Sequence, residues 1–98
     1  MTRITTHPGE ILRDEFMIPL GLSANALARA LGVPPNRITA IIAKESPRAV
    51  TPDTALRLSR YFGTTPEVWL NLQVAYDLSA AIAQRGMDID RLVHPRAA

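Results

Sequence analysis

The sequence predicts an all-α fold, a compact bundle of five helices that forms a single domain over residues 1–98. Its 98 residues, 47% of them apolar, can bury one modest hydrophobic core. Proline and glycine divide the chain into pieces of helix length. No piece shows the strict alternation or the β-branched and aromatic enrichment that is typical of strands. We therefore expect helices joined by short loops.

The first predicted helix begins at Pro8, because proline fits the first helical position, and it ends at Pro19 and Gly21. Its inward side chains are Ile11, Leu12 and Phe16. Ser23 caps the second predicted helix, and Gly32 closes it in a left-handed conformation. The shared apolar face of this second helix carries Leu27, Ala28 and Leu31.

The third predicted helix follows after only three residues and has Pro35 in its first turn. Helical periodicity points one set of side chains inward, namely Ile38, Ile41 and Ile42. The same periodicity leaves a second set toward solvent, namely Asn36, Arg37, Thr39 and Ala40.

Two Thr-Pro pairs open the last two helices, because threonine caps a helix and proline suits its first position. The pair at residues 51–52 begins a helix that ends at Gly63 and buries Ala55, Leu58 and Phe62. The pair at residues 65–66 begins a helix that runs toward Gly86.

This last helix is apolar around too much of its circumference for one bundle to cover. One stripe carries Trp69, Tyr76, Ala80 and Ala83, and a second carries Val68, Leu72, Ala75 and Ile82. We predict that residues 65–98 form a dimerisation helix and tail, with contacts from Trp69, Leu72, Tyr76 and Ile82. In the alternative, a tail with Ile89, Leu92 and Val93 folds back and covers the helix within one subunit.

Positive charge is concentrated in the middle third of the chain. Residues 29–60 hold six basic and two acidic side chains, whereas the segments on either side each have a net charge of −1. A polyanion would therefore dock on the middle third, although a merely solvated basic face would have the same composition.

The composition also limits where the protein works and which chemistry it can perform. The chain has no cysteine, which excludes disulfides. Residues 1–10, MTRITTHPGE, contain no apolar core of the length typical of a signal peptide, and no apolar run approaches membrane-spanning length. We expect a cytoplasmic protein. With only His7, at a helix cap, and His94, in the tail, no metal or catalytic arrangement has a convincing spacing, so neither an enzyme nor a cofactor is expected.

The second and third helices fit a helix-turn-helix unit over residues 23–43. Such a unit needs a small residue where its helices cross, a glycine in the turn and branched residues that lock the second helix. These residues are Ala28, Gly32, Val33, Ile38 and Ile41. The alternative is an ordinary helical hairpin.

The motif predicts which side chains could touch DNA, because the recognition helix presents its outward N-terminal residues to the major groove. The candidates for base readout are Asn36, Arg37, Thr39 and Ala40. The candidates at the DNA backbone are Ser23, Pro35, Lys44 and Arg48, with Pro35 setting the helix start beside a phosphate. Arg57 follows Asp53 by four residues, which favours a surface ion pair between them, and Arg60 is expected to be solvated.

Three stretches resemble the HigA, or VapI-like, antitoxins of the Cro/repressor-type helix-turn-helix class. They are the HPGE entry to the first helix, TPDTALRLSRYFGT, and WLNLQ, and the likeness covers about residues 7 to 78. The resemblance implies a lambda-repressor-like five-helix domain and a homodimer on a palindromic operator over its own promoter. It also implies neutralisation of a co-encoded HigB-type ribonuclease toxin. One departure is the turn of residues 43–48, AKESPR, which lacks the glycine usual in the family and is about two residues longer.

A toxin would most simply meet the acidic residues of the first helix, Glu10, Asp14 and Glu15, which lie away from the basic middle third. The alternative for this trio is a solvated helix surface. Two other functions stay open: a phage-type or plasmid-type regulator without a toxin, and a protein-interaction module that does not read DNA.

Overall fold

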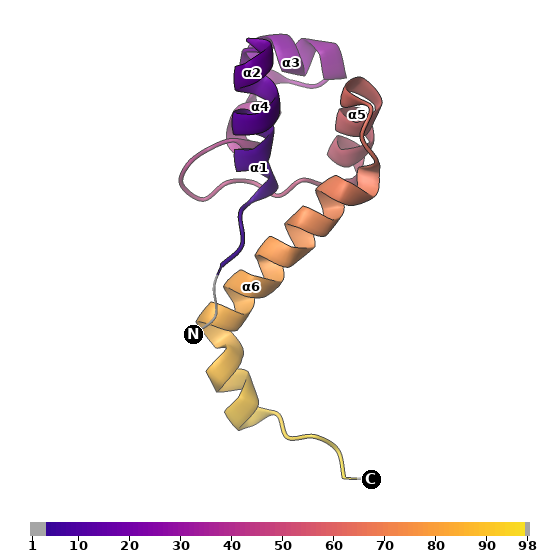
Figure 1. The fold of residues 1–98 in the computed structure, drawn as a ribbon. Helices are drawn as coiled ribbons and strands as arrows, with labels where there is room; N and C mark the ends of the chain where they lie inside the picture. Colours follow the sequence, from indigo (N-terminus) through magenta and orange to yellow (C-terminus); the bar gives the residue numbers. More distant parts are fainter. Residues whose placement is uncertain (1–3, 98) are drawn as a thin grey trace.

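A computed structural model describes residues 4–97; residues 1–3 and Ala98, which the predicted domain includes, lie outside that range. The described chain is all-helical and forms five continuous helical segments, as the sequence predicts. Figure 1 shows the last of them, α6, running away from the others. The elements are α1 (Pro8–Ile11), η1 (Leu12–Met17), α2 (Ile18–Leu20), α3 (Ala24–Leu31), α4 (Pro35–Ile41), α5 (Pro52–Phe62) and α6 (Pro66–Leu92). No helix within residues 4–97 is long and apolar enough to cross a membrane.

The first predicted helix is the continuous segment α1, η1 and α2, and Pro19 does not stop it. Its middle part is a π-helix, in which the amide of Ile18 donates to the carbonyl of Arg13, five residues earlier. Proline lacks an amide hydrogen and its ring clashes with the carbonyl four residues before it in an α-helix. The wider π turn relieves that clash. Gly21, at φ 65°, then ends the segment.

The remaining helix starts agree with the predicted caps. The hydroxyls of Ser23, Thr51 and Thr65 accept hydrogen bonds from the amides of Ala26, Thr54 and Val68, respectively. Gly32 and Gly63 adopt positive φ at the ends of α3 and α5.

The core lies where α1, η1, α3, α4 and α5 meet the first turns of α6. Its buried apolar side chains are Leu12, Met17, Leu27, Ala28, Leu31, Ile38, Ile41, Val50, Ala55, Leu58 and Trp69. The largest is Trp69, which is 1% exposed. Its ring packs 5.3 Å from that of Phe16, and its indole N–H donates to Thr64 at 2.8 Å.

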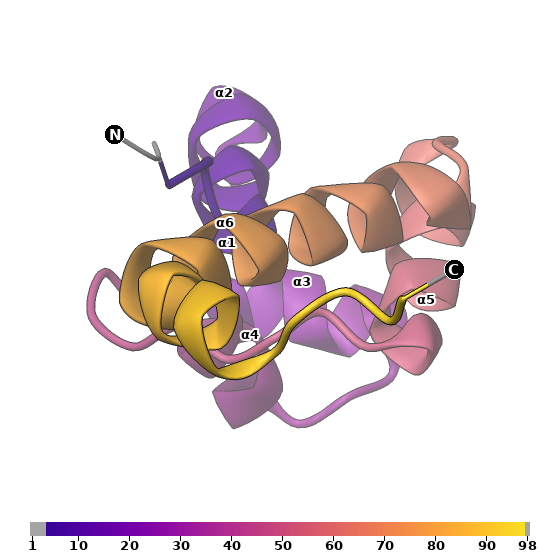
Figure 2. The same cartoon turned by 90° about the horizontal axis from the view of Figure 1, so that it is seen from below.

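Helix α6 is longer than predicted and projects out of the bundle. It continues through Gly86 to Leu92, because one glycine inside an alanine-rich helix costs only about 1 kcal/mol. Pro95 lies three residues beyond its end, where a proline commonly follows a helix. Figure 1 shows that the second half of α6 extends away from the other helices, and Figure 2, seen from below, shows this half in front of them. The tail does not fold back, since Ile89, Leu92 and Val93 are all exposed, and the alternative that it covers α6 is wrong.

Two hydrogen bonds join the first half of α6 to segments far away in the sequence. The side-chain carbonyl of Gln73 accepts from the amide of Val50 at 2.8 Å, in the segment that leads from α4 to α5. The hydroxyl of Ser79 accepts from the amide of Thr5 at 3.0 Å. Helix α6 is therefore fixed to the bundle by polar contacts as well as by Trp69.

Candidate nucleic-acid interface

Helices α3 and α4 form the helix-turn-helix unit that the sequence predicts. Ala28 is completely buried between the two helices, and Gly32 takes φ 71° in the turn. The amides of Gly32 and Val33 donate to the carbonyls of Arg29 and Ala28, which closes α3 before the chain turns. Ile38 and Ile41 are buried on the inner face of α4, so the register of the second helix is fixed.

The four candidate base readers lie on the outer side of α4. Asn36 and Thr39 are exposed, and Arg37 and Ala40 are partly exposed. The hydroxyl of Thr39 donates to the carbonyl of Asn36 at 3.3 Å, which leaves its methyl group available for an apolar contact. The structure therefore brings all four to one surface.

Arg37 has a partner that the sequence does not predict. Its guanidinium forms an ion pair with the carboxylate of Asp53, with Nη1 and Oδ2 2.6 Å apart. Arg57 forms the predicted ion pair with the same carboxylate at 3.0 Å. The signal available in the sequence was the four-residue spacing of Asp53 and Arg57; the contact with Arg37 spans 16 residues and needs the tertiary fold.

The candidates for backbone contacts flank this surface. Ser23, Pro35, Lys44 and Arg48 are all exposed. Ser23 already accepts a hydrogen bond from its own helix, so only its hydroxyl hydrogen could be offered to a phosphate.

The turn after α4 contains no glycine, and a serine takes the left-handed backbone conformation that glycine usually adopts. Ser46 adopts φ 48°, a left-handed conformation that costs a non-glycine residue about 1–2 kcal/mol. The amide of Arg48 donates to the carbonyl of Ala40 at 2.9 Å and ties the turn to the end of α4. The longer turn therefore still holds Arg48 beside the recognition helix.

The predicted dimer contacts need correction. Trp69 belongs to the core, and Tyr76 packs edge-on against His7 with ring centroids 4.8 Å apart. Both are used within the chain because the first turns of α6 close the bundle, and Leu72 is half-buried beside them. Of the four predicted contacts only Ile82 lies on the exposed apolar face of α6. That face also carries Val74, Leu78, Ile89 and Leu92.

The acidic trio is less negative than its sequence suggests. Arg13 pairs with two of the three carboxylates, that of Asp14 at 2.9 Å and that of Glu10 at 3.9 Å. Arg13 also donates to the carbonyl of Ile42 at 3.1 Å, which connects η1 to the end of the recognition helix. Glu15 is exposed.

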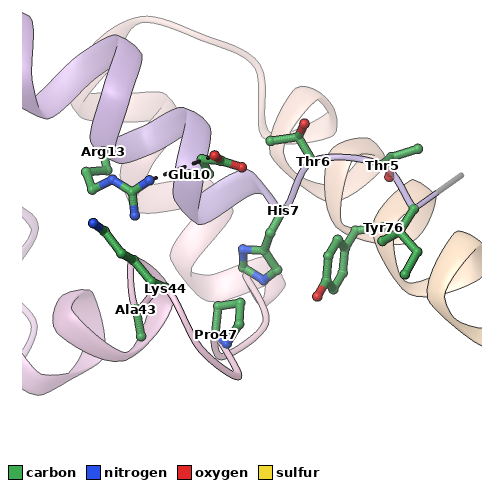
Figure 3. Close-up of a pocket in the computed structure, with 10 residues that line it drawn as sticks. Thr5, Thr6, His7, Glu10, Arg13, Ala43, Lys44, Pro47 and Tyr76 are labelled. Atoms are coloured by element: carbon green, nitrogen blue, oxygen red, sulfur yellow. Dashed lines mark ion pairs between the residues drawn. The ribbon is translucent and has the colours of Figure 1, made fainter.

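His7 lines a groove formed by the N-terminal segment, α1, the turn after α4 and α6 (Figure 3). Its Nδ1 accepts from the amide of Gly9 at 2.9 Å, which caps α1 and places the proton of the neutral ring on Nε2. Among the described residues, that buried Nε2 has no hydrogen-bond partner. Burial lowers the pKa of His7 below its ordinary 6.5, and the nearby Asp77 and the carbonyl of Arg48 offset only part of this.

Acid is expected to destabilise the fold through His7. Because the pKa of His7 is lower in the folded chain than in the unfolded chain, the unfolded state takes up a proton first, and stability falls as the pH drops below about 6.5. In His7→Asn the side-chain oxygen can still cap α1 but does not titrate. Thermal melts at pH 7.5 and pH 5 should therefore show a smaller loss of stability for the variant. Equal losses in the two proteins would assign the acid sensitivity to other groups.

Comparison with known proteins gives matches over most of the chain. A helix-turn-helix family model matches residues 14–70. Virulence-associated protein I of Dichelobacter nodosus is 59% identical over 75 residues, which cover 76% of this chain and 68% of that protein. Antitoxin GraA in complex with its operator superposes with a TM-score of 0.91 at 47% identity, covering 100% of this chain and 97% of that chain. Antitoxin HigA of Pseudomonas aeruginosa with the higBA promoter gives 0.86 at 43% identity, covering 94% and 98%.

Proposed function

Because this chain belongs to the helix-turn-helix family that includes the HigA-type antitoxins, we propose that it represses transcription by binding a palindromic operator as a homodimer. The family is one of DNA-binding regulators and not an enzyme class, in agreement with the expectation from the sequence. A regulator of a promoter acts where the chromosome is, so we place this protein in the cytoplasm. Bound over a promoter, it would exclude RNA polymerase.

The observation that carries this proposal is the outer surface of α4. An α-helix fits the major groove, where asparagine can pair with adenine and arginine with guanine through two hydrogen bonds each. Asn36 and Arg37 stand in the first turn of α4, and Lys44 and Arg48 follow its end, where the DNA backbone would pass.

The dimer is proposed to form along the exposed apolar face of α6. Beside Val74, residues alternately three and four positions apart run along this face and form a seam: Ala75, Leu78, Ile82, Arg85, Ile89 and Leu92. This is the spacing of a coiled-coil seam, and Arg85 is its single charged member. Because a two-fold pair presents the same face twice, a second copy of the chain is the partner that matches it. Such a dimer would place its recognition helices one DNA turn, about 34 Å, apart.

Replacing Arg37 with alanine tests base readout. We expect the affinity for the operator to fall about 10- to 100-fold, the value of one good contact to guanine, with little change on a scrambled duplex. Gel shifts at a fixed salt concentration measure both affinities. Arg60→Ala is the control, because it removes the same charge from an exposed position on α5 and should leave the ratio of the two affinities unchanged. Equal losses on both duplexes for Arg37→Ala would make Arg37 a phosphate contact.

We also propose that the protein neutralises a HigB-type ribonuclease toxin. Antitoxin HigA-1 of Vibrio cholerae is 41% identical over 71% of this chain, and the exposed Glu15 with its acidic neighbours offers a basic toxin a docking surface. Co-expression with the adjacent gene tests this: its product should co-purify with this chain and lose its ribonuclease activity. If no such product exists, the chain is a stand-alone regulator. If the chain shows no DNA binding that weakens steeply as the salt concentration rises, it is an interaction module that does not read DNA.

A further inference from the structure

The carboxylate of Asp53, on α5, binds the guanidinium of Arg37, the residue of α4 proposed to contact guanine. Nη1 of Arg37 donates to Oδ2 of Asp53 at 2.6 Å, and Asp53 lies in the first turn of α5. Nε of Arg57, one turn further along α5, donates to the same oxygen at 3.0 Å. One carboxylate oxygen therefore joins the recognition helix to α5.

Arg57 is itself anchored at the turn of the helix-turn-helix unit. Its Nη1 donates to the carbonyl of Leu31 at 2.8 Å and lies 3.4 Å from the carbonyl of Gly32. These carbonyls belong to the last residue of α3 and to its C-cap. The side chain of Arg37 is thus connected to the backbone of the turn through Asp53 and Arg57, so its position is set by the tertiary fold.

The charges of this trio suit a surface that meets DNA. Two guanidinium groups surround one carboxylate, and they hold the pKa of Asp53 below its usual value, the contact with Arg57 contributing most. An unpaired carboxylate at this place would repel phosphates, whereas the trio keeps a net positive charge.

The contact with Asp53 leaves the reading edge of Arg37 available. A guanidinium carries five N–H donors in a rigid plane, and guanine requires two of them. Asp53 engages Nη1, and within residues 4–97 no hydrogen bond uses Nε or Nη2 of Arg37. The same group can therefore accept support on one side and donate to guanine N7 and O6 on the other.

We propose that Asp53 is a positioning residue that fixes Arg37 for one G·C base pair in each half-site and so determines operator specificity at that position. The inference rests on the proposed DNA-binding function. A free arginine loses much rotamer freedom when it binds. A guanidinium already held in place loses less on the matching base pair. It is also less able to turn toward a phosphate when the base is wrong.

The test is Asp53→Asn, which keeps the shape of the side chain and removes its charge. The probes are a duplex selected by the wild-type protein from a random pool, the same duplex with each base pair changed in turn, and a scrambled duplex. Loss of a negative charge can raise affinity for every duplex, so the measured quantity is discrimination at each position. We expect discrimination at one G·C pair per half-site to fall about tenfold and the other positions to keep theirs.

Two further variants separate positioning from charge and from stability. Glu67→Gln is the matched control, since Glu67 follows Thr65 and Pro66 in α6 as Asp53 follows Thr51 and Pro52 in α5. It should leave every ratio unchanged. Asp53→Glu restores the carboxylate and should recover part of the discrimination. In an Arg37→Lys background, which lacks the planar fork, Asp53→Asn should have no further effect on that position.

The outcomes distinguish this inference from the function on which it rests. Unchanged discrimination in Asp53→Asn, or an equal loss at all positions, would overturn the positioning role and leave DNA binding intact. A wild-type protein that binds the selected and scrambled duplexes equally would contradict the proposed function itself. Thermal melts of all variants confirm that the folded protein is being compared.

Discussion

Replacing Gly9 with alanine is expected to destabilise the fold by more than about 3 kcal/mol, a large part of the ~5–15 kcal/mol that holds a domain of this size together. A Cβ at Gly9 would lie 1.9 Å from the carbonyl oxygen of Ile41 and 2.8 Å from its carbonyl carbon. These are backbone atoms at the end of the recognition helix, so no side-chain rotation can relieve the overlap. The first helix or α4 would have to move.

Urea or thermal unfolding followed by circular dichroism measures the effect. Gly86→Ala is the control, since its Cβ would meet only side-chain atoms of Ile82, the Cγ2 methyl at 3.3 Å and the Cβ at 3.9 Å, and no backbone of another helix. It should be neutral or stabilising by up to about 1 kcal/mol. If the two alanine variants were equally stable, the close approach of the first helix to α4 would be contradicted. A partly folded Gly9→Ala should also lose operator binding, because α4 is the element that is displaced.

Charge in the proposed seam of α6 should abolish tight operator binding. Leu78 and Ile82 are 59% and 43% exposed, so Leu78→Glu with Ile82→Glu should not disturb the monomer. Between two copies, four carboxylates would face an apolar seam and prevent association. A dimer on two half-sites gains roughly 100-fold or more over one subunit, because the second contact becomes intramolecular. We expect operator affinity to fall by about that factor.

Sedimentation and gel shifts with the same samples test this prediction. The control is Ala83→Glu with Met87→Glu, which places the same charge at exposed positions on another side of α6. That variant should remain dimeric and bind the operator. A seam variant that stays dimeric would show that another surface joins the subunits. A monomeric variant with unchanged affinity would show that the dimer is not needed for binding.

Local chemistry made most of the fold predictable from the sequence. Caps at Ser23, Thr51 and Thr65, and glycines at positive φ, act within one turn of the chain, so residue type alone indicates where helices begin and end. The helix-turn-helix unit is predictable for the same reason. Its requirements, such as a buried Ala28, fall at fixed short spacings.

The features that escaped prediction depend on packing between distant segments. A proline such as Pro19 normally ends a helix. Here the helix continues because the π turn before Pro19 makes room for its ring, and residue type alone does not predict that turn. Nothing local distinguishes the face of α6 that takes Trp69 into the core from the face left outside. The contact of Arg37 with Asp53 likewise depends on how α4 and α5 meet. The roles of the base-reading and backbone residues stay predictions.

The hydrogen bond between Val50 and Gln73 ties the segment that leaves the recognition helix to the helix proposed to join the subunits. If two subunits meet along α6, the distance and rotation between their recognition helices follow from the fixed angle between α4 and α6. Two parts of the protein would then determine its operator. Side chains on α4 would recognise the base pairs of each half-site, and the geometry of α6 would set the number of base pairs between the half-sites. During divergence, one substitution in α4 could match a changed base pair within a half-site. An inserted base pair between the half-sites would instead require a different arrangement of the two subunits.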